Sequence, residues 1–183
     1  MEYRPELIGG HLGLDLVNTV AWRLDPARTV DRFAELPNVQ RWLVAAGVSS
    51  DEAVTTQLRD DLVAARDVAY DVLAPLAVGR QPTRAAIDAL HGLIADVVRS
   101  ASVEVDPFGW RADDPAGAVR LAVWRLFEDE DLGRLRQCGD EGCGWLFLDR
   151  SKNGSRRWCS SADCGNRARA RRHYERARGG RTA

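Results

Sequence analysis

The run Cys138-Gly139-Asp140-Glu141-Gly142-Cys143 is followed fifteen residues later by Cys159-Ser160-Ser161-Ala162-Asp163-Cys164. These are the four cysteines of the 183-residue chain, arranged as two Cys-x4-Cys pairs. A tight loop can hold two sulfurs about 3.5 to 4 Å apart, as a tetrahedral ion with metal–sulfur bonds of about 2.3 Å requires. The glycines of the first loop allow a sharp turn. The spacing predicts one structural Zn2+ bound by Cys138, Cys143, Cys159 and Cys164.

Four cysteines have other uses, namely two disulfides, an iron–sulfur cluster, another metal or redox sensing. Residues 1–10 hold acids and a proline but no apolar core, so they do not look like a secretory signal. We therefore expect a reducing, cytoplasmic environment, which disfavours disulfides. Two symmetric pairs are also more usual for zinc than for an iron–sulfur cluster.

The residues around the pairs predict how the site is built. Trp145-Leu146-Phe147-Leu148 alternates aromatic and leucine side chains, as a strand does, and Arg156-Arg157-Trp158-Cys159 is the predicted partner strand. Asn153-Gly154 between them is a strong turn signal. The stretch from Cys164 to about Arg178 contains no proline and predicts a helix that carries the last ligand. Knuckle, β-hairpin and helix together indicate a treble-clef-like zinc finger.

These residues closely resemble the CGNR zinc-finger family. The resemblance runs through Cys143-Gly144-Trp145-Leu146-Phe147-Leu148-Asp149, Ser151 to Ser160, and Cys164-Gly165-Asn166-Arg167, and covers about Leu132 to Arg178. One departure is Ser161, where the family often has methionine; it concerns packing more than metal binding. The resemblance implies a zinc-binding, DNA-binding module of bacterial transcription regulators.

The N-terminal segment contains Gly13-Leu14-Asp15-Leu16-Val17-Asn18-Thr19, which resembles the opening of the ABATE domain, the usual predecessor of the CGNR finger. This second resemblance spans roughly Ile8 to Phe127 and implies a sensing or regulatory role. In a helix, His11, Asp15 and Asn18 would share one face and are candidates for a ligand pocket. The alternative is that Asp15 and Asn18 cap or hydrogen-bond neighbouring backbone.

Helices are predicted for most of the chain before the cysteines. Their signals are Asn38 as the cap of a helix over Val39 to Ala46, a Ser49-x-x-Glu52 capping box, Thr83 as a further cap, and Asp114-Pro115 as the last helix start. Leu58, Leu62, Ala65, Ala69, Val72 and Leu76 form an apolar stripe that favours core packing over a dimer seam. Val103-Glu104-Val105 predicts a short strand. The predicted fold class is mainly α (α+β), with a helical domain at 1–131 and the finger at 132–183.

Charge is divided unevenly along the chain. Residues 150–183 hold eleven Arg or Lys against Asp163 and Glu175, a formal charge of +9, which leaves −10 for residues 1–149 of a chain whose net charge is −1. Because guanidinium groups suit phosphate, the basic end predicts nucleic-acid binding. The candidate contacts are Arg150, Lys152, Arg156, Arg157, Arg169, Arg171, Arg172 and Arg176. Arg167, with Asn166 beside it, is the candidate for offsetting the formal −2 charge of a zinc ion with four thiolates.

The function predicted from these features is that of a zinc-dependent, DNA-binding transcription regulator. Four cysteines leave no open coordination position for catalysis, and no nucleophile motif or phosphate loop stands out, so no enzyme activity is expected. Two alternatives stay open: an RNA-binding module, in which Trp145 and Trp158 stack on bases, and a protein-interaction module with a purely structural finger. A small-molecule effector and a homodimer are further expected partners. The apolar runs are too short for a membrane span.

Overall fold

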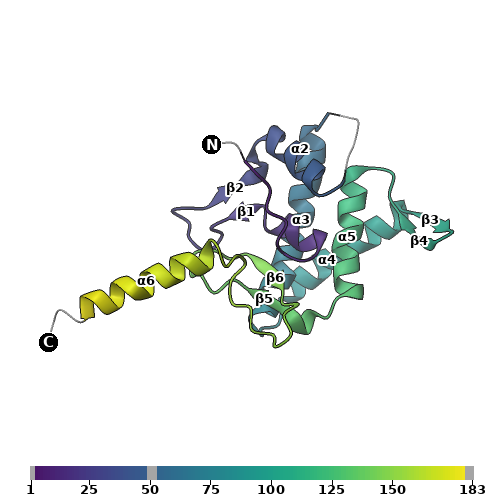
Figure 1. Cartoon of the computed structure of the whole chain (residues 1–183). Coiled ribbons are helices and arrows are strands. Elements are labelled where there is room, and N and C mark those ends of the chain that lie inside the picture. The colour runs from purple at the N-terminus through teal and green to yellow at the C-terminus, as the bar shows by residue number, and fades with distance from the viewer. Residues whose placement is uncertain (1–2, 49–52, 180–183) are drawn as a thin grey trace.

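The computed structural model describes residues 3–48 and 53–179. Six α-helices and three two-stranded antiparallel sheets are present in these ranges, which confirms the mainly α (α+β) class (Figure 1). The helices are α1 (Leu12–Val17), α2 (Leu36–Ala45), α3 (Thr56–Ala77), α4 (Arg84–Ser100), α5 (Pro115–Asp129) and α6 (Cys164–Gly179), with 3-10 turns η1 (Arg32–Ala34) and η2 (Leu132–Arg134). The paired strands are β1 (Val20–Ala21) with β2 (Val30–Asp31), β3 (Ser102–Val105) with β4 (Phe108–Arg111), and β5 (Leu135–Gln137) with β6 (Leu146–Leu148).

One hydrophobic core joins helices α1 to α5 and extends into the strands β5 and β6. The stripe predicted on α3 faces this core, with Leu62, Ala65, Ala69 and Val72 buried, while Leu58 and Leu76 at its ends are half-buried. Leu135, Leu146 and Leu148 belong to the same core. The boundary predicted at residue 132 therefore separates two stretches of sequence that share one core.

Of the four predicted helix starts, two are confirmed, one is wrong and one lies outside the described residues. Thr83 caps α4 through Ala86 N–H, and Asp114 caps α5 through Gly117 N–H, as predicted. The Ser49-x-x-Glu52 box lies outside the described residues, and α3 begins at Thr56 with Thr55 as its cap. The Asn38 cap was wrong: α2 begins at Leu36, because Pro37 is favourable in a first helical turn and fixes its own φ there.

The predicted hairpin of the finger has the right first strand and the wrong partner. β6 pairs with β5, which precedes the first cysteine, so the loop holding Cys138 and Cys143 is itself the hairpin connection. The segment 156–159 forms no strand. Asp149 accepts hydrogen bonds from Ser151 N–H and Arg156 N–H, which closes the intervening stretch into a loop instead of a turn between strands.

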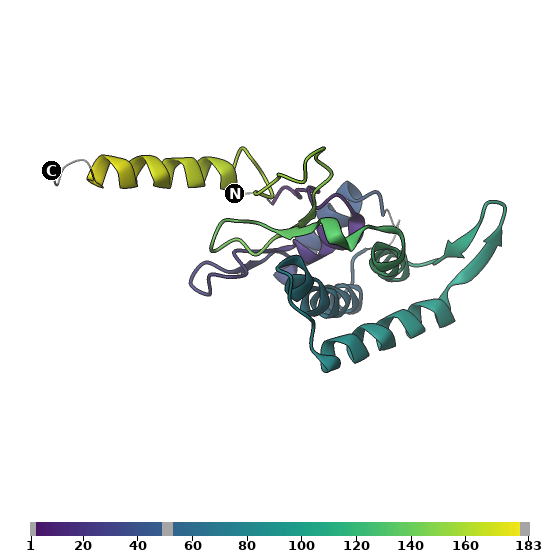
Figure 2. The same cartoon turned by 90° about the horizontal axis from the view of Figure 1, so that it is seen from below.

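Two elements project from the packed body. Figure 2 shows α6 extending away on one side, and the β3–β4 hairpin extending from the end of α4 on the other. Among residues 164–178, whose burial is described, α6 buries only Cys164, Gly165 and Ala168, all in its first turns. Packing within the described residues therefore does not explain why residues 169–178 of α6 are helical.

Candidate zinc centre and basic helix

Strand β6 separates the two packed regions of the molecule. Its alternation places Leu146 and Leu148 in the main core, whereas Phe147 on the opposite face packs with the four cysteines. Asn18, at the end of α1, fixes this strand: its Nδ2 donates to the Leu146 carbonyl at 2.8 Å, and its Oδ1 accepts from Leu146 N–H at 2.9 Å. The N-terminal segment therefore holds the finger in place.

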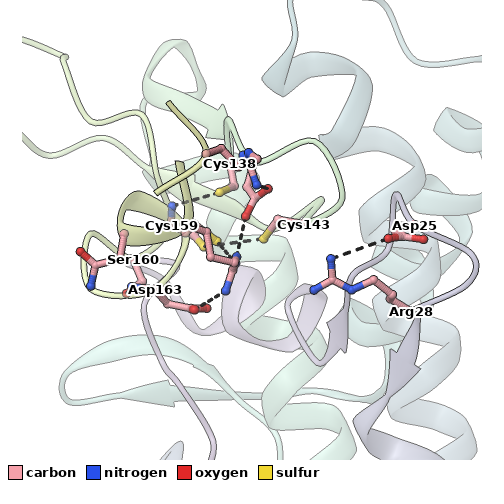
Figure 3. Close-up of polar contacts among 12 residues, drawn as sticks. Asp25, Arg28, Cys138, Cys143, Cys159, Ser160 and Asp163 are labelled. Carbon is pink, nitrogen blue, oxygen red and sulfur yellow. Dashed lines mark hydrogen bonds and ion pairs between the residues drawn. The ribbon is translucent and has the colours of Figure 1, made fainter. Parts of the chain in front are cut away.

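The four cysteine sulfurs converge at one point. All four are buried, and their sulfurs lie within 4.8 Å of one another. Sγ of Cys159 is 3.7 Å from Sγ of Cys143 and 3.4 Å from Sγ of Cys164 (Figure 3). These separations match the edges of a tetrahedron with metal–sulfur bonds of about 2.3 Å. The residues present therefore fit one structural Zn2+, and the closed set of thiolates leaves no position for catalysis.

The pKa values of the thiols also favour a cation at this site. Hydrogen bonding to Cys143 and the other thiols holds the pKa of Cys138 far below its usual range, while hydrogen bonding with Cys138 and the other thiols raises the pKa of Cys159. Four packed thiols thus cannot all ionise without a cation. A Zn2+ ion at their centre would stabilise all four as thiolates.

Backbone hydrogen bonds orient the two knuckles. Cys138 N–H donates to the Trp145 carbonyl at 2.8 Å, and Gly139 N–H donates to the Arg157 carbonyl at 2.8 Å. Cys159 N–H points at Sγ of Cys138, 3.4 Å away. A side chain at Gly139 would meet the Arg157 carbonyl at 3.1 Å, which favours glycine there. The segment 156–159 therefore crosses over the first knuckle, although it forms no strand.

Arg167 lies where a group that offsets thiolate charge would lie. Its Nη2 donates to Sγ of Cys164 at 2.8 Å, and its Nε donates to Oδ2 of Asp140 at 2.9 Å. A further ion pair joins it to Asp163, labelled in Figure 3. Asn166 is exposed and bonds locally, to the carbonyl of Ala162, without a sulfur contact. The contact with Cys164 supports the charge-offsetting role predicted for Arg167.

Two buried aspartates of the finger were not singled out from the sequence. Asp140, only 2% exposed, binds Arg167 and also Arg171, whose Nη1 is 3.2 Å from Oδ1. Asp149 is fully buried and holds the loop to Arg156, and hydrogen bonding from Ser151 keeps the pKa of its carboxyl low. Asp140 lies between the ligands Cys138 and Cys143. An acidic residue at that position, with an Arg-rich helix later in the chain, is the sequence signal that could have identified it.

The predicted basic residues that precede α6 differ in how far their side chains are bonded within the protein. Arg156 stacks over Phe147, 4.1 Å from the ring centroid, and donates to the carbonyls of Ile8, Trp158 and Cys159. Arg150 pairs with Glu130 at 2.6 Å. Lys152 and Arg157 are exposed, and Arg157 lies over Trp158. Arg156 is thus engaged in holding the finger together, whereas Lys152 and Arg157 face solvent.

The arginines of α6 fall on different faces. Arg167 and Arg171, four residues apart, turn toward Asp140, whereas Arg169, Arg172 and Arg176 share another face at spacings of three and four. Arg169 donates to the carbonyl of Ser161 at 3.0 Å. Within residues 3–48 and 53–179, Arg172 and Arg176 have neither an ion pair nor a hydrogen bond from their side chains. The outer face of α6 therefore carries uncompensated positive charge.

The three candidate pocket residues have backbone partners. His11 is the N-cap of α1, its Nδ1 accepting from Gly13 N–H at 3.1 Å, and Asp15 accepts from Gly9 N–H at 2.8 Å. Asn18 holds β6, as described. These bonds are of the kind expected from the alternative to a pocket, and ligand binding by the three residues stays a prediction.

Comparison with known families agrees with this arrangement. The family model described as "Putative stress-induced transcription regulator" (ABATE) matches residues 10–135, well over half of the chain, and the CGNR zinc finger model matches residues 134–177. No curated protein matches the sequence. None of the described helices has the length and apolar character needed to cross a bilayer. The chain belongs to the ABATE family of transcription regulators and carries a CGNR zinc finger after its ABATE domain.

Proposed function

We propose that this regulator binds duplex DNA through the outer face of α6, with zinc fixing the base of that helix. The observation that carries the proposal is a projecting helix whose Arg172 and Arg176 have no partner in the described part of the chain. Charge of this kind is unfavourable on an isolated protein surface because neighbouring guanidinium groups repel one another. Phosphate groups would remove that repulsion.

The dimensions of α6 suit the major groove. Its 16 residues span about 24 Å at about 1.5 Å per residue, and a helix of about 10 to 12 Å diameter fits a groove about 12 Å wide. Arg169, Arg172 and Arg176 would then face phosphates or guanine edges along one side. Lys152 and Arg157 on the loop before α6 would add phosphate contacts.

RNA binding is less well supported by the aromatic residues of the finger. Trp145 donates through Nε1 to the Val20 carbonyl at 2.8 Å, so its ring is engaged within the protein. Trp158 is half-buried against Gly139 of the first knuckle and Gly165 of α6. Neither ring forms the open stacking platform that unpaired bases require.

The test is to remove charge from the outer face without weakening the helix. In the double variant Arg172→Ala, Arg176→Ala, both changes raise helix propensity, so α6 should persist. We expect affinity for duplex DNA to fall about 30-fold or more at low salt. The slope of log affinity against log salt should become shallower by about 2, since each phosphate contact contributes about 0.9.

A matched control comes from α4, where Arg84→Ala, Arg99→Ala removes the same charge from exposed positions on a different helix. This variant should bind DNA as the wild type does. Equal losses in both variants would mean that only net charge matters, and an unchanged affinity in the α6 variant would refute the proposed surface. Preferential competition by single-stranded RNA would favour the RNA-binding alternative, and absence of any nucleic-acid binding would favour a protein partner.

The ABATE domain, in this proposal, modulates the finger in response to an effector in the bacterial cytoplasm. Support comes from the hydrogen bonds between residues 8–24 and the finger, which give the N-terminal unit a direct mechanical connection to the zinc site. Self-association is a second route, because paired copies would place two α6 helices on one DNA.

A further inference from the structure

Trp22, in the loop between β1 and β2, lies against the base of α6. Two arginines lie over its ring: Cζ of Arg167 is 4.5 Å from the ring centroid and Cζ of Arg28 is 3.3 Å from it. Arg167 is the residue that also binds Cys164 and Asp140. The loop and α6 are therefore joined by one aromatic ring from a segment more than 130 residues earlier in the chain.

The backbone of Trp22 has an uncommon conformation that its surroundings maintain. Its φ of 55° is in the left-handed region, which bulky residues rarely adopt. The next two N–H groups, of Arg23 and Leu24, donate to the carbonyls of Cys143 and Gly142 at 3.1 and 3.3 Å. The Trp22 carbonyl accepts from Thr29 Oγ1 at 3.0 Å. A conformation of this kind persists where the surrounding structure fixes it, often at a functional site.

We infer that Trp22 is a positioning residue, through which the ABATE domain holds the base of α6 in place for ligand binding. Beyond residue 168, α6 buries no side chain, so its direction depends on the contacts of its first turns. Those contacts include the ligand Cys164, the Asp140 pairs with Arg167 and Arg171, and the Trp22 ring against Arg167. The contact between Trp22 and Arg167 brings the N-terminal unit directly to a side chain of α6.

Trp22, Arg28 and Arg167 together form a clamp, and Arg28 is its solvent-exposed member. It is about half exposed and pairs with Asp25 (Figure 3), so one of the two arginines over the Trp22 ring is a side chain that solvent reaches. A change in the loop 22–29 would act on Arg167, and hence on α6, without replacing any of the four cysteines. The loop is thus the place where the N-terminal unit can alter DNA binding; that last step rests on the proposed function.

The experiment compares Trp22→Ala with Trp22→Phe, and with Trp110→Ala on the distant β3–β4 hairpin as a control, using zinc-loaded protein without DNA. Hydrogen exchange of the α6 amides should become about 10-fold faster in Trp22→Ala, should return toward the wild-type rate in Trp22→Phe because an aromatic face remains, and should not change in Trp110→Ala. Zinc content should stay at one per chain in all three.

Affinity for duplex DNA should fall about five- to tenfold in Trp22→Ala with an unchanged salt slope, because the phosphate-binding arginines remain. Unaltered α6 exchange in Trp22→Ala would overturn the inference. Loss of zinc in Trp22→Phe would also overturn it, since Trp22 would then serve the fold of the metal site. If the α6 amides exchange faster in Trp22→Ala but the wild-type protein binds no nucleic acid, the proposed function is refuted, whereas the positioning role of Trp22 is supported.

Discussion

Helices α3 and α6 are held in this protein by opposite means. α3 buries Leu62, Ala65, Ala69 and Val72, and even its arginine Arg66 is buried and paired with Asp31 through two hydrogen bonds of 2.7 and 2.9 Å. α6 has charged or small side chains around nearly its whole circumference, and Arg172 and Arg176 point into solvent. The same residue type thus locks one helix into the core and leaves the other open to a partner.

The contrast shows what each helix requires. Burial of an amphipathic face stabilises α3, as for most helices in folded proteins, whereas an isolated helix of 16 residues is marginal in water. α6 therefore depends on its anchored first turns; in the proposed function, phosphate groups would stabilise it beyond them. Three further predictions test this division.

Zinc removal should produce the largest effect, and this effect should be confined to α6. A chelator would leave four buried thiols without a cation and free Cys164, the first residue of α6. We expect protection of the α6 amides against hydrogen exchange to be lost, with DNA affinity falling about 100-fold or more, while α3 stays protected. Restored zinc should reverse both changes. Retention of α6 protection in the metal-free protein would show that the helix does not need its anchor.

Truncating one large side chain on each helix should give unequal losses of stability. Leu62 is 0% exposed and Tyr174 is 68% exposed. Leu62→Ala should lower the free energy of unfolding by about 2 to 5 kcal/mol, because it removes burial and leaves a cavity, whereas Tyr174→Ala should change it by less than about 0.5 kcal/mol. Denaturant titration measures both. Similar losses would mean that Tyr174 packs in solution and that α6 is not a free helix.

The smallest effect is a dependence of stability on pH, which should arise in the helical core and leave α6 unchanged. Burial raises the pKa of Asp15, in α1, to about 6, although the Gly9 N–H opposes the rise. Because this folded-state pKa lies above the unfolded value of about 3.9, the folded protein binds the proton more tightly, so ionisation of Asp15 lowers stability progressively as pH rises from about 4 to about 6, and the loss is constant at higher pH.

Asp15→Asn keeps an oxygen acceptor for Gly9 and carries no charge. It should raise the free energy of unfolding by about 1 to 2 kcal/mol at pH 7.5 and make little difference at pH 4. α6 exchange should be the same in both proteins, because arginine stays charged throughout this range. A variant less stable than wild type at pH 7.5 would show that the carboxylate has a role beyond accepting from Gly9.

What the sequence predicted correctly was local. The cysteine pairs, the caps Thr83 and Asp114, and the helix beginning at Cys164 depend on residues within a few positions of one another, where spacing determines geometry. The partner of β6 could not be found this way: Leu135-Arg136-Gln137 has no distinctive pattern, and Asn153-Gly154 offered a stronger but misleading turn signal.

The remaining features join distant parts of the chain. Trp22 meets Arg167, and Asn18 meets Leu146, only after the N-terminal unit has packed against the finger. Charge counting gave the basic end, but it could not separate Arg156, which is bound to backbone carbonyls, from Arg172, which is not. Such distinctions depend on tertiary contacts that no local spacing encodes.

The most direct test of the account is the affinity of the zinc-loaded wild-type protein for duplex DNA as a function of salt. A helix that binds phosphate through several arginines predicts tight binding at low salt and a loss of about 10-fold or more between about 50 and 200 mM, with a slope of about 0.9 per contact. Protein that carries one zinc per chain and shows no affinity at low salt, or an affinity that salt does not change, would contradict it.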